Sequence, residues 1–96
     1  MRKKPSRNFV RLSLRLYVAG QLPHSAAAAA NLRSLCAGQF VRSPVVEIVD
    51  ALQDPERASG DGIVVAPMLV RLSPGPVVKI PGTLADQAWV RSALGL

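Results

Sequence analysis

One segment near the N-terminus joins a strand pattern to a helix pattern, and it limits the possible folds more than any other part of the chain. From Val10 to Val18 apolar residues alternate with polar ones. This period of two is typical of a β-strand with one buried face. The segment Arg15–Ser25, RLYVAGQLPHS, then passes through Gly20 and Pro23 into an alanine-rich stretch. The chain is therefore predicted to open with a strand, a loop and a helix.

The alanine-rich stretch predicts a helix that packs closely on a sheet. Ser25 is a favourable N-cap, alanine has the highest helix propensity, and Gly38 supplies a C-terminal stop. Ala28, Leu32, Leu35 and Cys36 lie on one stripe at spacings of three and four. We expect this stripe to face the core, with Cys36 as a small buried apolar residue.

The next segments predict a second strand and a short helix. Val45–Asp50 is β-branched almost throughout, as expected for a strand covered on both faces. Strand, helix and strand in this order imply a right-handed parallel βαβ unit. Asp54 and Pro55 then suit the cap and first position of a short helix, which Gly60 and Gly62 end.

The C-terminal part of the chain predicts a hairpin and a last helix. Met68–Leu72 and Val77–Ile80 resemble antiparallel strands, and the Pro-Gly centre of Ser73–Pro76 suits a type II turn. Thr83 and Asp86 approximate a capping box. The apolar side of the last helix is expected to comprise Trp89, Val90, Ala93 and Leu94. The predicted fold is α/β, in the order βαβαββα, with a mixed four-stranded sheet and three helices.

Length and charge predict one domain with a basic N-terminal half. We expect residues 1–8 to form a disordered basic tail and residues 9–96 to form a single domain. Residues 1–42 contain eight Lys or Arg and no Asp or Glu, whereas residues 43–96 contain four basic and six acidic residues. We interpret the excess as a solvated surface, because nucleic-acid binding usually adds exposed aromatics or a basic helix.

The predicted strand–loop–helix junction has no catalytic chemistry. Small α/β domains of thioredoxin type place redox cysteines at such a junction, but this one has none. Cys36 alone allows neither a CxxC pair nor an internal disulfide, which favours a reducing, cytoplasmic setting. His24 and Cys36, twelve residues apart, are not a metal cluster. We therefore expect no catalytic residue, cofactor or metal, and no apolar run is long enough for a membrane span.

Several motifs resemble the KaiB family of circadian-clock proteins. They are RLYVAG at Arg15–Gly20, VVEIVDALQDPE at Val45–Glu56, the strand at Ala66–Leu72, the proline turn at Pro74–Pro76 and IPGTL at Ile80–Leu84. Ala66-Pro67 also occupies the place of the cis-proline loop in thioredoxin-like folds. The resemblance covers about Leu12–Leu94. It implies a non-enzymatic, metamorphic protein whose partner-bound fold is thioredoxin-like, with an alternative KaiB ground-state fold.

The same resemblance implies partners and the residues that meet them. We expect docking on a KaiC-like ATPase, a histidine kinase or KaiA-like protein as a further partner, and self-association to a dimer or tetramer. The expected partner-binding residues are Asp50, Gln53, Asp54, Arg57, Asp61, Ala66 and Pro67. The expected structural or switch positions are Gly20, Pro67, Pro74, Gly75, Pro76 and Ala93.

Two alternative functions remain open, and one residue bears on which of the two folds the chain adopts. A thioredoxin-like redox or thiol-binding protein and a small basic nucleic-acid-binding domain remain as alternatives. Alanine at position 93 makes the free energy of helix formation more favourable than glycine there would, by about 0.8–1 kcal/mol. We therefore expect the thioredoxin-like form in this chain.

Overall fold

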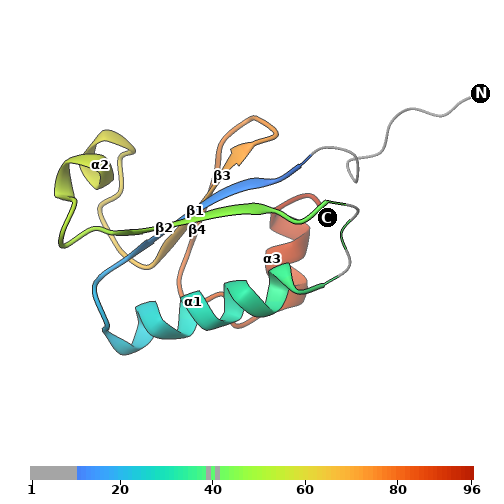
Figure 1. Ribbon diagram of the computed structural model, residues 1–96, viewed down its shortest axis with the longest axis horizontal. Coiled ribbons are helices and arrows are strands. Elements are labelled where there is room, and N and C mark those ends of the chain that lie inside the picture. Colours follow the sequence, from blue (N-terminus) through green and yellow to red (C-terminus); the bar gives the residue numbers. More distant parts are fainter. Residues whose placement is uncertain (1–10, 39, 41) are drawn as a thin grey trace, which may run out of the picture.

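The predicted order of helices and strands is confirmed. A computed structural model describes residues 11–38, 40 and 42–96. The elements are β1 (Ser13–Val18), α1 (Pro23–Cys36), β2 (Val45–Asp50), α2 (Pro55–Gly60), β3 (Met68–Ser73), β4 (Val78–Pro81) and α3 (Gln87–Ala93) (Figure 1). The tail predicted at residues 1–8 and the start of the domain at residue 9 lie outside the described residues.

The four strands form one mixed sheet, as predicted, and their order across the sheet is β2-β1-β3-β4. β1 runs parallel to β2 and antiparallel to β3, and β4 runs antiparallel to β3. α1 and α3 lie on one face of the sheet, whereas α2 lies beyond the end of β2 and packs on the other face (Figure 1). The sheet therefore separates a large α1–α3 layer from a small α2 layer.

The core is divided between the two faces of β1. On the α1–α3 face, Leu14 and Leu16 pack with apolar residues of α1, β3, β4 and α3. On the α2 face, Tyr17 is 0% exposed and packs with Val49 and Ala58. β1 is thus buried on both sides, although its alternating sequence predicts burial on one side. The second side is covered because α2 lies over the Tyr17 side chain.

The expectation that Val45–Asp50 is covered on both faces is wrong. β2 is an edge strand, and Ile48 remains 46% exposed. α1 packs against β1, so the α1 layer stops short of the β2 side chains Val46 and Ile48. A run of β-branched residues indicates a strand but does not distinguish a central strand from an edge strand.

The role expected for Ser25 is also wrong. α1 begins at Pro23, and its N-cap position, Leu22, has no side-chain hydrogen bond. Ser25 lies inside the first turn, is buried, and its Oγ accepts the Ala19 N–H at 2.8 Å. The hydroxyl therefore ties the end of β1 to the helix. The helix ends at Cys36, two residues before Gly38, and the Cys36 side chain is only half-buried.

The β3–β4 turn differs from the predicted type II turn. A type II turn needs a positive φ at its glycine, and Gly75 does not have one. The Ser73-Pro74 and Gly75-Pro76 bonds are both cis, as is Ala66-Pro67. The restricted backbone of two prolines around one glycine replaces the turn that the Pro-Gly pair alone would favour.

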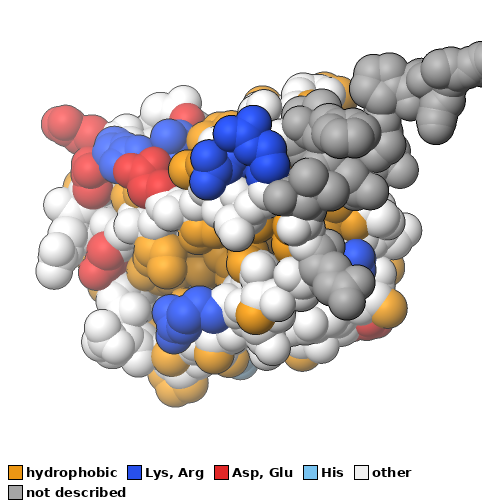
Figure 2. Space-filling model, turned by 45° about the vertical axis from the view of Figure 1, so that its right-hand side comes forward, with side chains coloured by type: hydrophobic (Ala, Val, Ile, Leu, Met, Phe, Trp, Pro, Cys, Tyr) orange, Lys and Arg blue, Asp and Glu red, His pale blue; other side chains and the backbone are white. Residues whose placement is uncertain are grey.

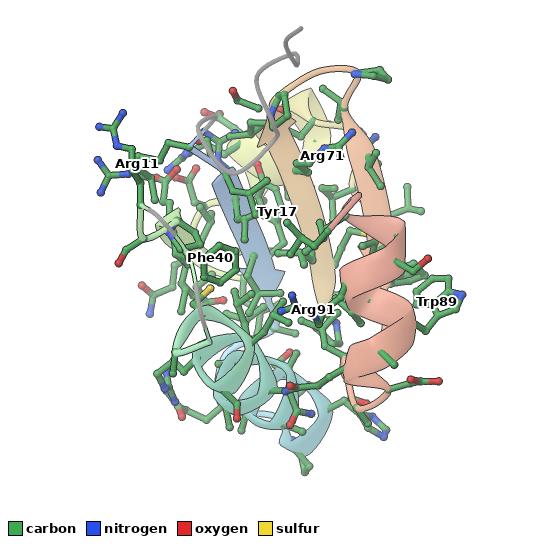
Figure 3. The ribbon with its side chains drawn as sticks, turned by 90° about the vertical axis from the view of Figure 1, so that its right-hand side faces the viewer. Arg11, Tyr17, Phe40, Arg71, Trp89 and Arg91 are labelled. Atoms are coloured by element: carbon green, nitrogen blue, oxygen red, sulfur yellow. The ribbon has the colours of Figure 1, made fainter. Side chains whose placement is uncertain are left out.

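Two predictions for α3 are corrected. Asp86, and not Thr83, is the N-cap, and its Oδ1 accepts the Trp89 N–H at 3.1 Å. Val90 and Leu94 are buried as predicted, but Trp89 is 55% exposed and points away from the sheet (Figure 3). Val90 and Leu94, four residues apart, occupy the buried face of the helix, which leaves Trp89 to one side of that face.

Polar contacts fix the C-terminal helix to the rest of the domain. The Asn31 side chain on α1 donates to the Thr83 carbonyl at 2.9 Å, and the Gln87 amide donates back to the Asn31 carbonyl at 3.0 Å. The buried Arg71 guanidinium donates to the Leu94 carbonyl at 2.7 Å and to the Pro76 carbonyl at 3.0 Å. These bonds join α3 to α1, to β3 and to the proline turn.

Replacing Ser25 by alanine tests the bond between β1 and α1. Removal of the hydroxyl leaves the Ala19 N–H without its partner, so S25A should lower the free energy of unfolding by about 1–3 kcal/mol. Urea denaturation measures this. The control is S34A at an exposed position of the same helix, which should change stability by less than about 0.5 kcal/mol. Equal losses in the two variants would contradict the assignment.

Candidate functional site

Three ion pairs form one cluster, in which one pair joins two strands and two pairs join α2 and its following turn to the sheet. Arg15 on β1 and Glu47 on β2 are opposite each other in the parallel register, with Nε and Oε1 at 2.9 Å. Arg15 Nη1 also lies 2.9 Å from Asp61 Oδ2, and Arg57 Nη1 lies 2.7 Å from Glu47 Oε2. The two arginines therefore connect a strand, its neighbour and the short helix.

Tyr17 completes this cluster of Arg15, Tyr17, Glu47, Arg57 and Asp61, called here the Tyr17 network. The hydroxyl lies within hydrogen-bond distance of Asp61 Oδ2, and of the Arg57 carbonyl at 3.2 Å. Burial, and the neighbouring Asp61 carboxylate, raise the pKa of Tyr17. Hydrogen bonds from Tyr17 and Arg15 lower the pKa of Asp61. The phenol thus keeps its proton and holds α2 in place.

Three of the predicted site residues shape the loops between the elements. Asp50 Oδ1 accepts the Gly20 N–H at 3.1 Å and the Leu52 N–H at 2.9 Å, so it joins the β1–α1 and β2–α2 loops. Gly20 has a φ of +55°, which favours glycine at this bend. Asp54 caps α2 as predicted, because its side chain accepts the Arg57 N–H.

An apolar groove lies between these loops and α2. Its volume is about 330 Å³. It is lined by Ala19, Ala51, Leu52, Pro55, Ala58, Ser59, Ile63, Val64, Val65 and Ala66. Leu52 is 68% exposed and Val64 is 90% exposed, so large apolar side chains flank the hollow and face solvent. Such a concentration of exposed apolar surface is typical of an interaction site.

The structure brings most of the predicted partner-binding residues to this end of the sheet, but in different roles. Ala66 lines the groove, and the buried Pro67 follows it. Gln53 is exposed and has no hydrogen bond from its side chain to any described residue. Asp50 and Asp54 stabilise loops as described above, and Arg57 and Asp61 belong to the Tyr17 network. That these residues form a binding surface remains a prediction.

The exposed apolar residues Leu52, Val64 and Val65 were not predicted as site residues from the sequence. Each lies outside the strands, next to turn residues, which is the signal that could have revealed them. Arg15 and Glu47 were also missed as a pair. Their relation follows from the parallel register of β1 and β2, which residue types alone do not determine.

The groove is suited to non-covalent binding. Its lining contains no cysteine or histidine. Cys36 lies at the far end of α1, and burial raises the pKa of its thiol. His24 is exposed in the first turn of α1. In the described part of the chain, no three His, Cys, Asp or Glu side chains form a metal cluster, and no helix could cross a membrane.

The fold and the groove together define a thioredoxin-like domain without a redox cysteine pair. The N-terminal domain of Synechococcus elongatus SasA superposes with a TM-score of 0.72 at 22% identity, covering 99% of this chain and 93% of that one. Chloroplastic thioredoxin z superposes with a TM-score of 0.67 at 16% identity, covering 90% and 80%. Both likenesses concern the fold.

Sequence comparison then identifies the family. The KaiB domain matches residues 15–96. The circadian clock oscillator protein KaiB of Picosynechococcus sp. is 37% identical over 83 residues, which are 86% of this chain and 80% of that protein. KaiB of Synechococcus sp. RCC307 is 36% identical, over 86% of this chain and 76% of that protein. The chain belongs to the KaiB family, as its motifs predicted.

The acid sensitivity of the Tyr17 network can be measured. Hydrogen bonds from Arg57 and Arg15 lower the pKa of Glu47 from 4.5 to about 2. Because the folded-state pKa is the lower one, the stabilisation is complete above about pH 4.5 and is lost as the pH falls through 2. Glu47→Gln should therefore lower the urea midpoint at pH 7, and this difference should shrink towards zero near pH 2.

The control for Glu47→Gln is Glu56→Gln, because Glu56 is exposed and has no ion pair within the described residues. Its urea midpoint should stay close to that of the wild-type protein at both pH values. A Glu47→Gln effect that is equal at pH 7 and pH 2 would contradict the assigned ion pairs.

The thiol of Cys36 should react slowly. Because burial raises its pKa, the thiolate fraction at pH 7 is lower than in a free cysteine, and half of the side chain is shielded. Reaction with a disulfide reagent should be at least tenfold slower than with glutathione and should accelerate in urea. A rate equal to or above that of glutathione would favour the thiol-chemistry alternative.

Proposed function

We propose that this chain is a non-enzymatic regulatory module that docks on a KaiC-like ATPase in the cytoplasm. The observation that carries the proposal is the apolar groove, flanked by the exposed side chains of Leu52, Val64 and Val65. The docking surface comprises this groove and the predicted partner-binding residues around it. Membership of a family that includes circadian clock oscillator proteins supports a regulatory role.

The surface is pre-organised for binding. The Asp50 carboxylate holds the two loops beside the groove, and the Tyr17 network holds α2. A surface that is already ordered loses little conformational entropy on association, so more of its contact energy contributes to affinity. Gln53 projects from this rigid frame without an internal partner among the described residues, which leaves its amide available to a partner.

Further partners and a second fold belong to the same proposal. Away from the groove, β2 exposes the side chains of Val46 and Ile48, and α1 exposes that of Arg33. These residues would contact a histidine kinase or a KaiA-like protein. The chain would self-associate, as a dimer or tetramer, in the alternative ground-state fold. The switch positions Pro67, Pro74, Gly75, Pro76 and Ala93 lie in the C-terminal half that would rearrange, and Gly20 supports the loop beside the groove.

Co-purification with the KaiC-like ATPase encoded in the same genome tests the docking. The wild-type chain should retain the ATPase in at least one nucleotide state, with ATP or with ADP. Gln53→Arg places a bulky charge on the docking surface and should weaken retention at least tenfold. Ser92→Arg, at an exposed position of α3 away from the groove, is the matched control and should bind like wild type.

Two results would contradict the proposal. One is failure of the wild-type chain to retain the ATPase in every nucleotide state. The other is equal retention of Gln53→Arg and wild type, because it would place docking elsewhere. Circular dichroism of both variants should match wild type, since each substituted side chain is exposed.

A further inference from the structure

We infer that the groove binds an extended, cationic and partly apolar segment of the partner, which pairs with the main chain of Val64–Ala66. The inference rests on the proposed function for the origin of this segment. Three independent features carry it: unpaired main-chain groups beside the groove, exposed apolar side chains that line it, and an unbalanced acidic rim.

The main chain of Val64, Val65 and Ala66 is fixed in position but unpaired. The preceding Ile63 N–H donates to the Ala58 carbonyl at 2.8 Å, and the following Pro67 carbonyl accepts the Gly82 N–H at 3.1 Å. Between these anchors, none of the three residues has a main-chain hydrogen bond to another described residue. The chain bends at Val65 and Ala66 before β3 begins. A segment laid beside these residues can therefore form a few main-chain hydrogen bonds of the kind that join strands, over a short stretch.

The side chains beside this segment favour an apolar occupant. Val64 and Val65, from the segment between α2 and β3, and Leu52, from the segment between β2 and α2, line the groove and are exposed. Removal of these apolar surfaces from water on binding is favourable. Because successive side chains of an extended segment point in opposite directions, every second residue of the occupant would enter the groove.

The charge around the groove selects cations. Glu47 and Asp61 are neutralised by Arg15 and Arg57, whereas Asp50, Asp54 and Glu56 have no ion pair within the described residues. Figure 2 shows acidic side chains gathered mainly at the left-hand end of the molecule, where Figure 1 places α2.

The positive net charge of the chain does not oppose this selection. Arg15 and Arg57, which lie at this end of the sheet, are already paired with Glu47 and Asp61 and so leave the charges of Asp50, Asp54 and Glu56 unbalanced. Screening at physiological salt limits the reach of each exposed charge to about 8 Å. The acidic residues beside the groove therefore determine which charge the groove attracts. The same rim disfavours a nucleic acid at this position.

A peptide titration followed by amide NMR tests the inference. The probe is an acetylated, amidated octapeptide, Lys-Arg-Thr-Val-Leu-Val-Arg-Lys, in 0.15 M salt. Its addition should shift the amides of Leu52 and of Val64–Ala66. The matched peptide with glutamate in place of every Lys and Arg should bind at least tenfold more weakly. Equal binding of both peptides, or shifts that lie outside the groove, would overturn the inference.

Modified peptides test the main-chain pairing separately. An extended segment presents alternate N–H groups to the edge that it joins. Two versions of the cationic octapeptide are therefore used, one N-methylated at its odd central residues and one at its even central residues. Each version can no longer donate main-chain hydrogen bonds from one of its two edges. One of them should lose binding at least tenfold while the other retains it. Equal retention by both would exclude pairing with Val64–Ala66.

Protein variants connect the peptide to the groove. The double variant Leu52→Ser and Val64→Ser removes exposed apolar side chains and should weaken peptide binding at least tenfold without loss of fold. Val77→Ser, an exposed valine outside the groove, is the matched control and should bind the peptide like wild type. Unchanged binding by the double variant would overturn the inference.

The two proposals fail in distinguishable ways. If the chain retains the ATPase but the peptide causes no shift, the inference is wrong and the proposed function stands. If the peptide binds in the groove but no ATPase is retained, the assigned partner is wrong, whereas the ligand class of the groove stands.

Discussion

The Tyr17 hydroxyl and the charges around it hold the α2 layer on the sheet. α2 has only six residues, and an isolated helix of that length is unstable in water. Its apolar contribution to the fully buried core is Ala58. The Asp54 cap stabilises the helix itself. Most of its attachment to the sheet therefore comes from Arg57 and Asp61, whose partners are on β2 and β1. The shape of the groove depends on this arrangement, because α2 forms one of its walls.

The same arrangement explains why several predicted binding residues have structural roles. Asp50, Asp54 and Asp61 each bind groups of their own chain, and they fix the loops on which exposed residues are carried. Carboxylates at strand ends and helix starts suggest contact with a partner when only the sequence is known. In the structure these carboxylates stabilise the loops and α2, and the groove between them is lined mainly by apolar residues.

Much of the fold could be predicted, because local patterns specify the elements and their order. Alternation identified β1, and Asp54 with Pro55 identified the start of α2. The prediction for Ser25 failed because its hydroxyl binds the end of β1 instead of the helix start. Those for Gly75 and Thr83 failed because nearby residues compete: two prolines restrict the turn, and Asp86 provides a cap closer to the helix. The exposure of β2 and of Trp89 depends on where neighbouring layers end, and residue types do not contain that information. For the candidate site, the acidic end could be predicted, whereas the groove required the path of the chain from α2 to β3.

Trp89 gives this chain a built-in spectroscopic label. It is the only tryptophan in the sequence, and it lies on α3 with more than half of its surface in water. Its emission therefore reports on the packing of the C-terminal helix and not on the groove, because α3 and the α2 cluster lie on opposite faces of the sheet. A change in tryptophan emission without a change in the groove amides would indicate that α3 moves independently. The two halves of the domain can thus be observed separately in the unmodified protein.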